Sequence, residues 1–350
     1  MKILVTGGAG FIGSHTCLLL LEKGYEVVVI DSYVNSKKKA IQRVIDILKS
    51  NNKINGFNIK AFNGDIRDEN ILEKIFSESQ QIGKPFHAVI HFAGLKSVSD
   101  SVSNPLHYWD VNFNGSINLL RVMNKYNCRT IVFSSSATIY GISDDKPLKE
   151  DTHIDPINPY GKTKAAIEQL LNDIYNSNPS EWRVVNLRYF NPIGAHFSGM
   201  IGESPNGIPN NIFPVITQVA SGSLDKLTIF GDNWPTKDGT AIRDYVHVMD
   251  LAEGHISALN YLVKSTNKII DLNIGTGLGT SVLELVRTFE RVNNVEIPLE
   301  FSTRRLGDCC TVIADNSKAL SCLGWRAKRS LEEMCKDGWK WQLLNPKGYT

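Results

Sequence analysis

A tyrosine and a lysine stand four residues apart in the segment NPYGKTK, residues 158–164, and together they could carry acid–base chemistry. A helix that begins near Pro159 would place Tyr160 and Lys164 on one face. A free tyrosine has a pKa of about 10 and is a poor base near neutral pH. An ammonium about 4 Å from its oxygen, at an effective dielectric of about 20, would lower that pKa by about three units. The same spacing also occurs on solvated helices, so the prediction depends on what surrounds the pair.

Hydroxyl side chains at the end of an apolar strand give the pair a partner. The segment VFSSSATIYG carries Ser134, Ser135 and Ser136 directly after a β-branched run. Ligands of parallel sheets bind beyond the carboxyl ends of the strands, where these serines are expected. The sequence therefore predicts that a serine hydroxyl and the Tyr160 phenol meet at one substrate oxygen.

A glycine-rich turn predicts a second, neighbouring site. In TGGAGFIG, Gly8, Gly10 and Gly13 satisfy GxGxxG, while Gly7 replaces Gly8 in the spacing GxxGxxG. Such glycines let backbone N–H groups approach a pyrophosphate at the start of a helix. Asp31 ends the second strand, 21 residues beyond Gly10, where a carboxylate holds ribose hydroxyls and repels a 2′-phosphate. We therefore expect NAD rather than NADP; a glycine turn without a ligand would leave the carboxylate to chance.

Two later turns are expected at the same edge of the sheet. Asp65, in GDIRD, follows the third strand and could accept a hydrogen bond from an adenine amino group. Gly94, in HFAGLKS, follows the fourth strand, and the loop 92–96 could line the pyrophosphate. Each segment alone indicates only an ordinary turn. Its position in sequence after the glycine motif supports a role in binding the cofactor.

The elements that must position these residues alternate between strands and helices. Short β-branched runs, which predict strands, are KILVT, EVVVI, HAVIHF, TIVFS and WRVVNLR, with NIKAF as a weaker member. Longer periodic segments, which predict helices, lie near 12–22, 37–49, 68–78, 105–125 and 161–176. This pattern is typical of an α/β fold with a doubly wound, Rossmann-type parallel sheet.

The alternation stops near residue 190, where prolines and the segment GMIGESPNG predict loops. Helices are expected again near 248–264, 280–293 and 330–344. We therefore expect a Rossmann domain over residues 1–190, which carries the catalytic residues, and a smaller mixed α/β C-terminal domain over 191–350. A crossing of the chain between the two near 230–275 is left open.

Composition narrows the partners to small molecules. In 350 residues, 38 Lys and Arg stand against 36 Asp and Glu, and a net charge of +2 gives no broad field for a nucleic acid or an anionic membrane. No apolar run approaches the roughly 20 residues of a membrane span. The six cysteines form no CxxC pair and the eight histidines no HExxH pattern, so we expect reduced thiols and no metal. The prediction is a cytoplasmic protein.

Nine motifs carry a resemblance to a known family, and they run in order from residue 2 to the C-terminus. The chain resembles the UDP-glucose 4-epimerases, which are extended short-chain dehydrogenases/reductases. The first motifs are shared by many relatives, whereas the later ones narrow the match. They are VTGGAGFIGSHT, GDIRDE, HFAGLKSV, FSSSATIYG, NPYGKTK, LRYFNPIGAH, GIPNN, DGTAIRDYVHVMDLA and RRLGD.

The resemblance implies an NAD-dependent isomerase that interconverts UDP-galactose and UDP-glucose by C4 epimerisation through a 4-keto intermediate. It also implies that residues 191–350 mainly bind the UDP-sugar. A homodimer built on the helices near 105–125 and 160–176 would be expected as well, although periodicity alone does not distinguish that face from internal packing.

Residue roles follow from the same resemblance. Tyr160 would be the catalytic base, Lys164 would hold the nicotinamide ribose and lower the tyrosine pKa, and Ser136 would bind the reacting sugar oxygen. Cofactor contacts would come from Gly7, Gly10, Phe11, Ile12, Gly13, Asp31, Asn35, Ser36, Asp65, Ile66, Phe92, Ala93, Gly94, Lys96, Asn112, Ser134, Tyr160, Lys164 and Phe190. Substrate contacts would come from Lys96, Ser136, Tyr160, Asn191, Asn211, Ile212, Thr228, Phe230, Arg243, Tyr245, Arg305, Asp308 and Val312.

Several of these residues have simpler readings without the resemblance. Arg243 and Arg305, which would face the diphosphate, are otherwise surface ion-pair residues, and Phe230 is otherwise a core residue. Val312 stands where some family members carry tyrosine, and a small residue there implies room for the N-acetyl group of UDP-N-acetylglucosamine and UDP-N-acetylgalactosamine.

Two alternative functions remain open. A nucleotide-sugar 4,6-dehydratase shares the fold and the tyrosine–lysine pair but needs an added acid/base pair, commonly Asp-Glu, where this chain reads SSATIYG. A non-catalytic protein that senses the dinucleotide would not require the intact set of Ser136, Tyr160 and Lys164.

Overall fold

The computed structural model describes residues 1–50, 56–143, 147–207, 209, 211–264, 268–305 and 307–350. Two of the motifs are therefore described only in part. Ile208 and Asn210 of GIPNN, and Leu306 of RRLGD, lie outside the described residues.

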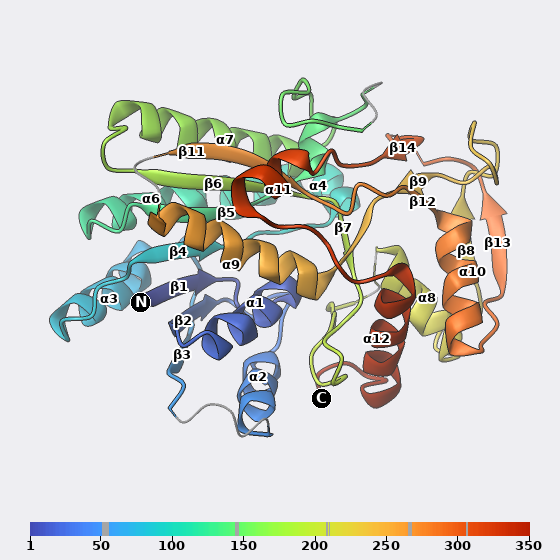
Figure 1. Cartoon of the computed structure of the whole chain (residues 1–350), viewed down its shortest axis with the longest axis horizontal. Coiled ribbons are helices and arrows are strands. Elements are labelled where there is room, and N and C mark those ends of the chain that lie inside the picture. Colours follow the sequence, from blue (N-terminus) through green and yellow to red (C-terminus); the bar gives the residue numbers. More distant parts are fainter. Residues whose placement is uncertain (51–55, 144–146, 208, 210, 265–267, 306) are drawn as a thin grey trace.

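One seven-stranded sheet forms the centre of the molecule (Figure 1). Its strand order is β11-β6-β5-β4-β1-β2-β3, and every neighbouring pair is parallel. The order reverses at β1, which is the switch point of a doubly wound sheet, and this confirms the predicted fold class. The strands are β1 (Lys2–Thr6), β2 (Glu26–Asp31), β3 (Ile59–Asn63), β4 (Ala88–His91), β5 (Thr130–Ser136), β6 (Arg183–Tyr189) and β11 (Ile269–Ile274).

Helices cover both faces of this sheet and bury a separate apolar cluster on each. On one face, α1 (Phe11–Glu22), α2 (Lys38–Ser50), α9 (Val248–Lys264) and α11 (Ser317–Leu323) supply residues to the first cluster. On the other face, α3 (Glu69–Gln81), α6 (Gly115–Lys125) and α7 (Pro159–Ser177) supply the second. The β-branched strands are buried on both sides, as a parallel sheet between two helical layers requires.

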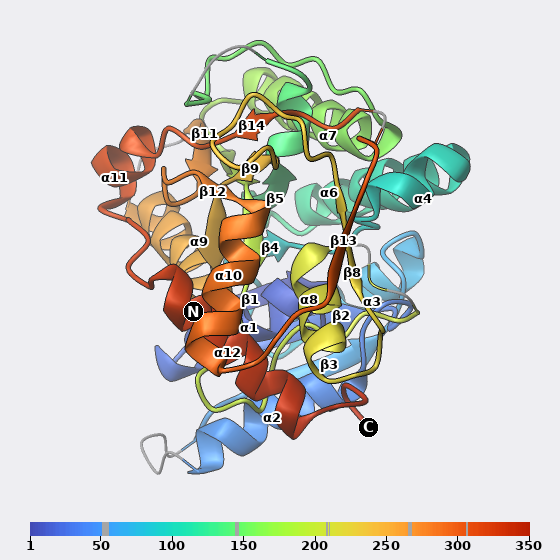
Figure 2. The same ribbon diagram turned by 90° about the vertical axis from the view of Figure 1, so that its right-hand side faces the viewer.

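A smaller group of elements lies at one end of the sheet (Figures 1 and 2). Its core joins α8 (Ile212–Ala220), α10 (Val282–Asn293) and α12 (Leu331–Leu344), and Phe289 and Ile216 lie fully buried in it. Its short strands are β7 (Asn191–Ile193), β8 (Leu227–Phe230), β9 (Ile242–Arg243), β10 (Tyr245–His247), β12 (Thr280–Ser281), β13 (Leu299–Ser302) and β14 (Thr311–Val312). These strands form small sheets, β10-β7, β12-β9-β14 and β13-β8, beside the carboxyl ends of the main strands.

The chain returns to the main sheet after the smaller group has begun. Helix α9 packs against α1, and β11 pairs with β6 from Ile269↔Val184 to Ile274↔Tyr189. The residues that follow β6 therefore complete the central sheet as well as forming the smaller group.

The single helix expected over 105–125 is wrong in detail. The structure has α5 (Pro105–Tyr108), then a π-helical segment η1 (Trp109–Asn114), then α6. Wide turns of this kind are rare and often occur at functional sites. Helices α4 (Val98–Ser103), α8 and α11 were not expected.

Candidate active site

Helix α7 carries the tyrosine and lysine, and its start is fixed by local sequence. Asn158 caps the helix, with its side-chain oxygen accepting a hydrogen bond from the Gly161 N–H at 2.9 Å, and Pro159 occupies the first turn. Gly161 has no room for a side chain, since a Cβ there would lie 2.8 Å from the Thr138 carbonyl oxygen. The helix start is therefore held against the turn that follows β5, which brings Tyr160 to the serines.

Lys164 is buried and its ammonium is held from β5. Its Nζ donates to the Ser134 carbonyl oxygen at 2.7 Å and lies 5.9 Å from the centre of the Tyr160 ring. Burial lowers the pKa of Lys164 to about 8, while the charge of Glu168 acts in the opposite direction. Near neutral pH the ammonium is therefore charged but close to its point of titration.

Tyr160 lies beside Ser136, and this pairing was expected. Ser136 ends β5, and its hydroxyl accepts hydrogen bonds from the Thr138 N–H at 3.2 Å and the Thr138 hydroxyl at 3.0 Å. The expected direction of the tyrosine shift differs, however. Burial raises the pKa of Tyr160 above its ordinary value, and a hydrogen bond with Ser136 opposes that rise. A lowering by Lys164 must therefore overcome the burial of the phenol.

Asn112 joins the π-helical segment to both the cofactor loop and α7. Its Oδ1 accepts from the Leu95 N–H at 2.7 Å, and its Nδ2 donates to the Leu95 carbonyl and the Thr163 hydroxyl, both at 3.1 Å. Gly94 lies against this side chain, since a Cβ there would be 3.2 Å from the Asn112 Oδ1 and 3.8 Å from the Lys164 Nζ. The hydrogen bonds of Asn112 therefore keep the loop after β4 beside α7.

The glycine turn after β1 forms a narrow backbone cradle. Gly7 has φ +68°, and a Cβ there would lie 2.7 Å from the Ala93 nitrogen. A Cβ on Gly13 would lie 2.4 Å from the Gly7 carbonyl oxygen, so this glycine is required for close helix packing. Gly10 is the N-cap of α1 and supplies no capping side chain. The start of α1 is therefore open to an anionic group, as a dinucleotide pyrophosphate requires.

Asp31 ends β2 and organises the loop beyond it. One carboxylate oxygen accepts from the Ala9 N–H at 2.9 Å, and the other accepts from the Tyr33 N–H at 2.9 Å and the Ser36 hydroxyl at 2.7 Å. The carboxylate thus links the glycine turn to the loop that carries Asn35 and Ser36. The cradle and this strand-end carboxylate fit the pyrophosphate and adenosine ribose of NAD, and the negative charge disfavours a 2′-phosphate.

The other expected cofactor residues lie near the same edge of the main sheet, and each has a different environment. Asp65 accepts three hydrogen bonds from Arg67, which lower its pKa, and Arg67 also pairs with Asp110 at 2.6 Å. Ile66 is buried against Gly115, and Phe92 stacks on His255 with ring centres 4.7 Å apart. Phe11 forms a T-shaped ring contact with His15, and the expected residues that lie in or beside the apolar clusters are Ile12, Ala93 and Phe190.

Two expected substrate residues are register partners across β9 and β14. Val312 lies opposite Arg243, and the Arg243 guanidinium donates to the Cys309 carbonyl oxygen at 2.9 Å. Val312 also packs beside the cluster that contains Phe190 and Ala314, with Ala137 and Ala165 next to it. This position therefore lies close to the residues that follow Ser136 and Lys164.

Arg305 lies over an aromatic ring on the neighbouring strand pair. Its guanidinium carbon is 4.1 Å from the centre of the Phe230 ring, and its Nε is 3.8 Å from an oxygen of Asp308. Arg304 stacks in the same way on Trp234, at 3.9 Å. Arg305 is thus held against Phe230 at the end of β8.

Glu203 joins two of the expected ligand residues and was missed from the sequence. Its carboxylate accepts from the Lys96 ammonium at 2.6 Å and from the Asn211 amide at 3.2 Å, and the side chain is 9% exposed. It lies in GMIGESPNG, which was expected only as a loop, and a carboxylate next to Gly202 carried no separate signal.

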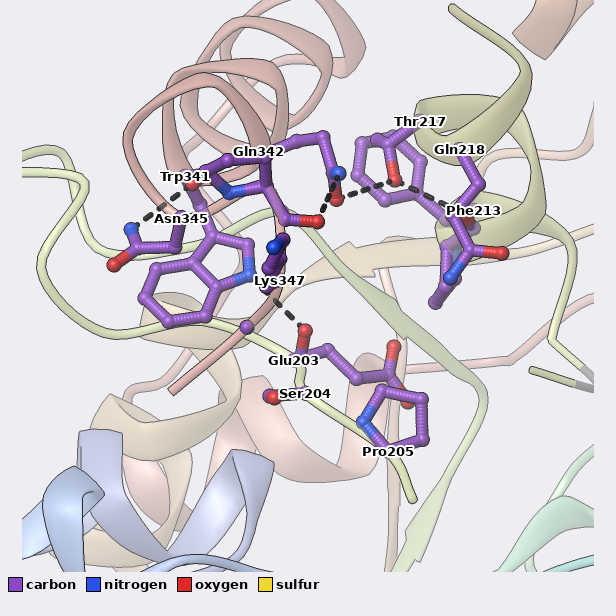
Figure 3. Close-up of a pocket in the computed structure, with 15 residues that line it drawn as sticks. Glu203, Ser204, Pro205, Phe213, Thr217, Gln218, Trp341, Gln342, Asn345 and Lys347 are labelled. Atoms are coloured by element: carbon purple, nitrogen blue, oxygen red, sulfur yellow. Dashed lines mark hydrogen bonds between the residues drawn. The ribbon is translucent and has the colours of Figure 1, made fainter. Parts of the chain in front are cut away.

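A cavity of about 200 Å³ lies behind Glu203, between α8, α12 and the C-terminal segment (Figure 3). Figure 3 shows the Gln342 side chain pointing towards Thr217, whose hydroxyl donates to it at 3.4 Å. Of the expected site residues, none lines this cavity. We therefore regard it as separate from the edge that carries Tyr160.

The remaining expected substrate residues contact the smaller group of elements. Tyr245 is buried in the core of the smaller group and lies opposite Asn191 in the β10–β7 pair. Ile212 packs beside the same core, and the Thr228 hydroxyl donates to Glu300 at 2.9 Å. Their assignment to the substrate stays a prediction.

Within the ranges that the structure describes, no three histidine, cysteine or acidic side chains are arranged to hold a metal ion. Likewise, none of the helices in those ranges combines the length and the apolar character needed to span a membrane.

Proteins with this sheet and a serine, tyrosine and lysine at its carboxyl edge are short-chain dehydrogenases/reductases, and the chain falls in that class. A family model described as GDP-mannose 4,6 dehydratase matches residues 4–338. UDP-glucose 4-epimerase of Bacillus subtilis (strain 168) is 50% identical over 349 residues, which span 100% of this chain and 99% of that protein.

Solved structures give the same result. UDP-glucose 4-epimerase from Bifidobacterium longum, in complex with NAD+ and UDP, has a TM-score of 0.92 and 43% identity, with 99% of this chain and 100% of that chain covered. The UDP-Glc/GlcNAc 4-epimerase from Campylobacter jejuni has a TM-score of 0.81 and 34% identity, with 98% and 99% covered. The chain belongs to the UDP-glucose 4-epimerase family, as its motifs predicted.

Proposed function

We propose that this chain is a UDP-glucose 4-epimerase that interconverts UDP-galactose and UDP-glucose with NAD as a resident cofactor. The observation that carries the proposal is the meeting of Ser136, Tyr160 and the buried Lys164 at the edge that also holds the glycine cradle. Relatives named for this reaction match the whole chain, which supports the same assignment.

The chemistry requires a group that moves a proton at the sugar C4 hydroxyl. Tyr160 takes this proton and later returns it, while the Ser136 hydroxyl binds the same oxygen. The Lys164 ammonium favours the ionised phenol by its charge. When bound, NAD supplies the acceptor and donor of hydride at C4. Because the cofactor ends as it began, the reaction needs no external oxidant.

Inversion at C4 requires the sugar ring to turn while the nucleotide stays fixed. We assign the fixed end to Arg243 and Arg305, whose guanidinium groups suit a diphosphate. The Cys309 carbonyl oxygen holds Arg243 and the Phe230 ring supports Arg305, so neither depends on the sugar for its position. In this proposal residues 1–190 carry the cofactor and the catalytic groups, and 191–350 mainly bind the UDP-sugar.

We also propose activity on UDP-N-acetylgalactosamine and UDP-N-acetylglucosamine. Val312 is smaller than tyrosine, and it packs against the same apolar cluster as the small side chains of Ala137 and Ala165. An acetamido group at C2 therefore has room that a tyrosine at residue 312 would fill. A related protein of known structure is named for both plain and N-acetylated substrates, which supports this breadth.

A second copy of the chain is the partner that we propose. Helices α4, α5 and the start of η1 expose the large apolar side chains of Val98, Val102, Leu106 and Trp109. Leu106 is 85% exposed, which is unusual for leucine, and Leu106 and Trp109 fall within the segment 105–125 on which a homodimer was expected. The buried cysteines Cys17, Cys128 and Cys335 are thiols, which favours a reducing compartment such as the cytoplasm.

The function is tested by incubating the purified protein separately with UDP-galactose and UDP-N-acetylgalactosamine, without added NAD, and separating the products by anion-exchange chromatography. Conversion of both to their gluco epimers would support the reaction, the retained cofactor and the broad substrate range together. Conversion of the plain hexose alone would remove the proposal for Val312. Conversion of neither, even after NAD is added, would remove the epimerase assignment.

A further inference from the structure

Two consecutive serines of β5 form hydrogen bonds with side chains from successive turns of α7. The Ser134 carbonyl oxygen accepts from the Lys164 ammonium at 2.7 Å, and the Ser135 hydroxyl donates to the Glu168 carboxylate at 2.5 Å. Glu168 follows Lys164 by four residues, so both side chains lie on one face of α7. The buried carboxylate is therefore placed one helical turn behind the buried ammonium.

A buried arginine holds this carboxylate from the neighbouring strand. Arg188, on β6, donates from Nε at 3.1 Å and from Nη2 at 2.7 Å to the two oxygens of Glu168. The side chains of Arg188 and Glu168 are 2% and 4% exposed, so neither charge is screened by water. Burial raises the pKa of Glu168, and the two hydrogen bonds from Arg188 oppose that rise. Such a two-pronged pair favours the ionised carboxylate.

A second carboxylate pairs with the same guanidinium. Asp271, on β11, lies 3.0 Å from Arg188 Nη2, and its other oxygen accepts from the Asn186 amide at 2.8 Å. The remaining arginine nitrogen donates to the Tyr140 hydroxyl at 3.0 Å and the Glu150 carbonyl oxygen at 2.8 Å. Two carboxylates therefore pair with the one guanidinium behind Lys164, and the Glu150 carboxylate, whose pKa burial raises, also interacts with Arg188.

The other groups that face Lys164 do not supply a negative charge. His91, on β4, is buried, and its pKa is lowered to about 3 by burial and by the Lys164 charge, so it is neutral. Tyr160 precedes Lys164 by one turn, and the Phe133 ring centre lies 4.9 Å from its Nζ. Of the residues that the structure describes, Glu168 carries the charge that raises the Lys164 pKa.

We propose that Glu168 is a positioning residue for the reaction: held by Arg188 and Ser135, it keeps the Lys164 ammonium charged so that Tyr160 can act as a base. This inference rests on the proposed function, because it concerns the same tyrosine and lysine. The proposal gives a role to Glu168 in the spacing YxxxKxxxE. It also gives a role to the ion pairs of Arg188 with Glu168 and Asp271, which link α7, β6 and β11.

The test measures the charge of Lys164 directly as well as the rate. Protein labelled with 13C and 15N in lysine is titrated by NMR, and the Lys164 signal is assigned by its loss in Lys164→Arg. In Glu168→Gln the titration midpoint of Lys164 should fall by about one pH unit or more, the shift expected on losing a nearby opposite charge. The high-pH limb of epimerase turnover should move down with it.

Three further variants separate this role from a structural one. Asp271→Asn leaves Glu168 in place and changes only the outer anion of the group, so it should leave the Lys164 midpoint nearly unchanged. Glu168→Asp keeps a carboxylate and should restore part of the shift. Glu78→Gln breaks a surface ion pair with Lys60, 2.9 Å apart, and should leave the Lys164 midpoint unchanged.

The outcomes distinguish the two proposals. If Glu168→Gln lowers the melting temperature while the Lys164 midpoint stays where it was, Glu168 is structural and the inference is overturned. If Glu168→Gln does not fold, a Lys164 midpoint in Glu168→Asp equal to that of the unaltered protein overturns it. If the unaltered protein converts no UDP-sugar, the proposed function fails, and the NMR midpoints still report whether Glu168 sustains the Lys164 charge.

Discussion

Val312 and Arg243 lie opposite each other in the parallel pair of β14 and β9. Partners in register point to the same face of a small sheet, so the residue that we assign to substrate breadth shares a face with an arginine that we assign to the diphosphate. Val312→Tyr should lower kcat/KM for UDP-N-acetylgalactosamine about tenfold or more, with a smaller effect on UDP-galactose, because steric exclusion of one group is worth about 1–3 kcal/mol. Val312→Ala is the matched control. Equal losses on the two sugars in Val312→Tyr would contradict the proposed pocket.

Tyr160→Phe should lower turnover by about 10²- to 10⁴-fold, since it removes the proton-transferring hydroxyl. The Phe ring keeps the shape of the tyrosine, so folding and retained NAD should be nearly unchanged. Turnover is measured at saturating UDP-galactose, and retained NAD by absorbance after denaturation. Thr138→Val removes a hydroxyl that bonds Ser136 and serves as a milder control. A near-normal rate in Tyr160→Phe would exclude the tyrosine from its proposed role.

Asp31→Asn should release NAD during gel filtration, because an amide holds ribose hydroxyls less well than a carboxylate. It should also loosen the loop through the bonds to Tyr33 and Ser36. Ser36→Ala separates these effects, since it removes the loop contact and keeps the carboxylate. Retention of NAD by Asp31→Asn at the level of the unaltered protein would argue against the ribose site.

His91 makes the stability of the fold depend on acidity. Burial and the Lys164 charge lower its folded-state pKa to about 3, whereas an unfolded histidine has a pKa of about 6.5. Between these values the unfolded chain binds a proton that the folded chain does not, so the free energy of unfolding falls as pH falls. The contribution is about 1.4 kcal/mol per pH unit well below pH 6.5.

Urea unfolding from pH 7 to pH 4 measures this slope. His91→Gln should flatten it by about that amount, although the variant loses stability at pH 7 because His91 bonds both Thr6 and Ser116. His107 is exposed, and His107→Gln is the comparison for a histidine outside the core. An unchanged slope in His91→Gln would show that His91 is protonated in the folded protein.

Leu106→Glu should convert the proposed dimer to a monomer, because a charge at the centre of an apolar contact loses its water without gaining a partner. Mass is measured by light scattering during gel filtration. Leu278→Glu changes another exposed leucine, 70% accessible, away from these helices and should leave the mass unchanged. A monomeric unaltered protein would remove this proposal.

The sequence predicted the main strands well because β-branched runs between glycine turns have few alternatives. β1 covers the expected run KILVT, and even the weak run NIKAF overlaps β3 at Ile59–Asn63. β11 was missed although it joins the same sheet and lies between two expected helices, because the short run IIDLNI contains Asp271 and Asn273, residue types that are depleted in strands. Helix α8 was missed because Pro214 lies inside it, at a position in the first turn where proline is tolerated.

The contacts of the site likewise divide into those that local motifs predict and those that depend on long-range packing. The loop bonds of Asp31 and the approach of Tyr160 to Ser136 follow from motifs that are local in sequence. Glu203 was not found because its link to Lys96 spans 107 residues. The direction of the Tyr160 pKa was also missed, since burial is set by packing and not by the spacing of the tyrosine and lysine.

The return of the chain to β11 has a consequence for how the molecule folds. A fragment that stops at residue 190 would leave β6 as an open edge and would uncover the side of α1 that α9 buries. We therefore expect the two lobes to melt in a single cooperative transition, and the shortened chain to aggregate when it is produced alone.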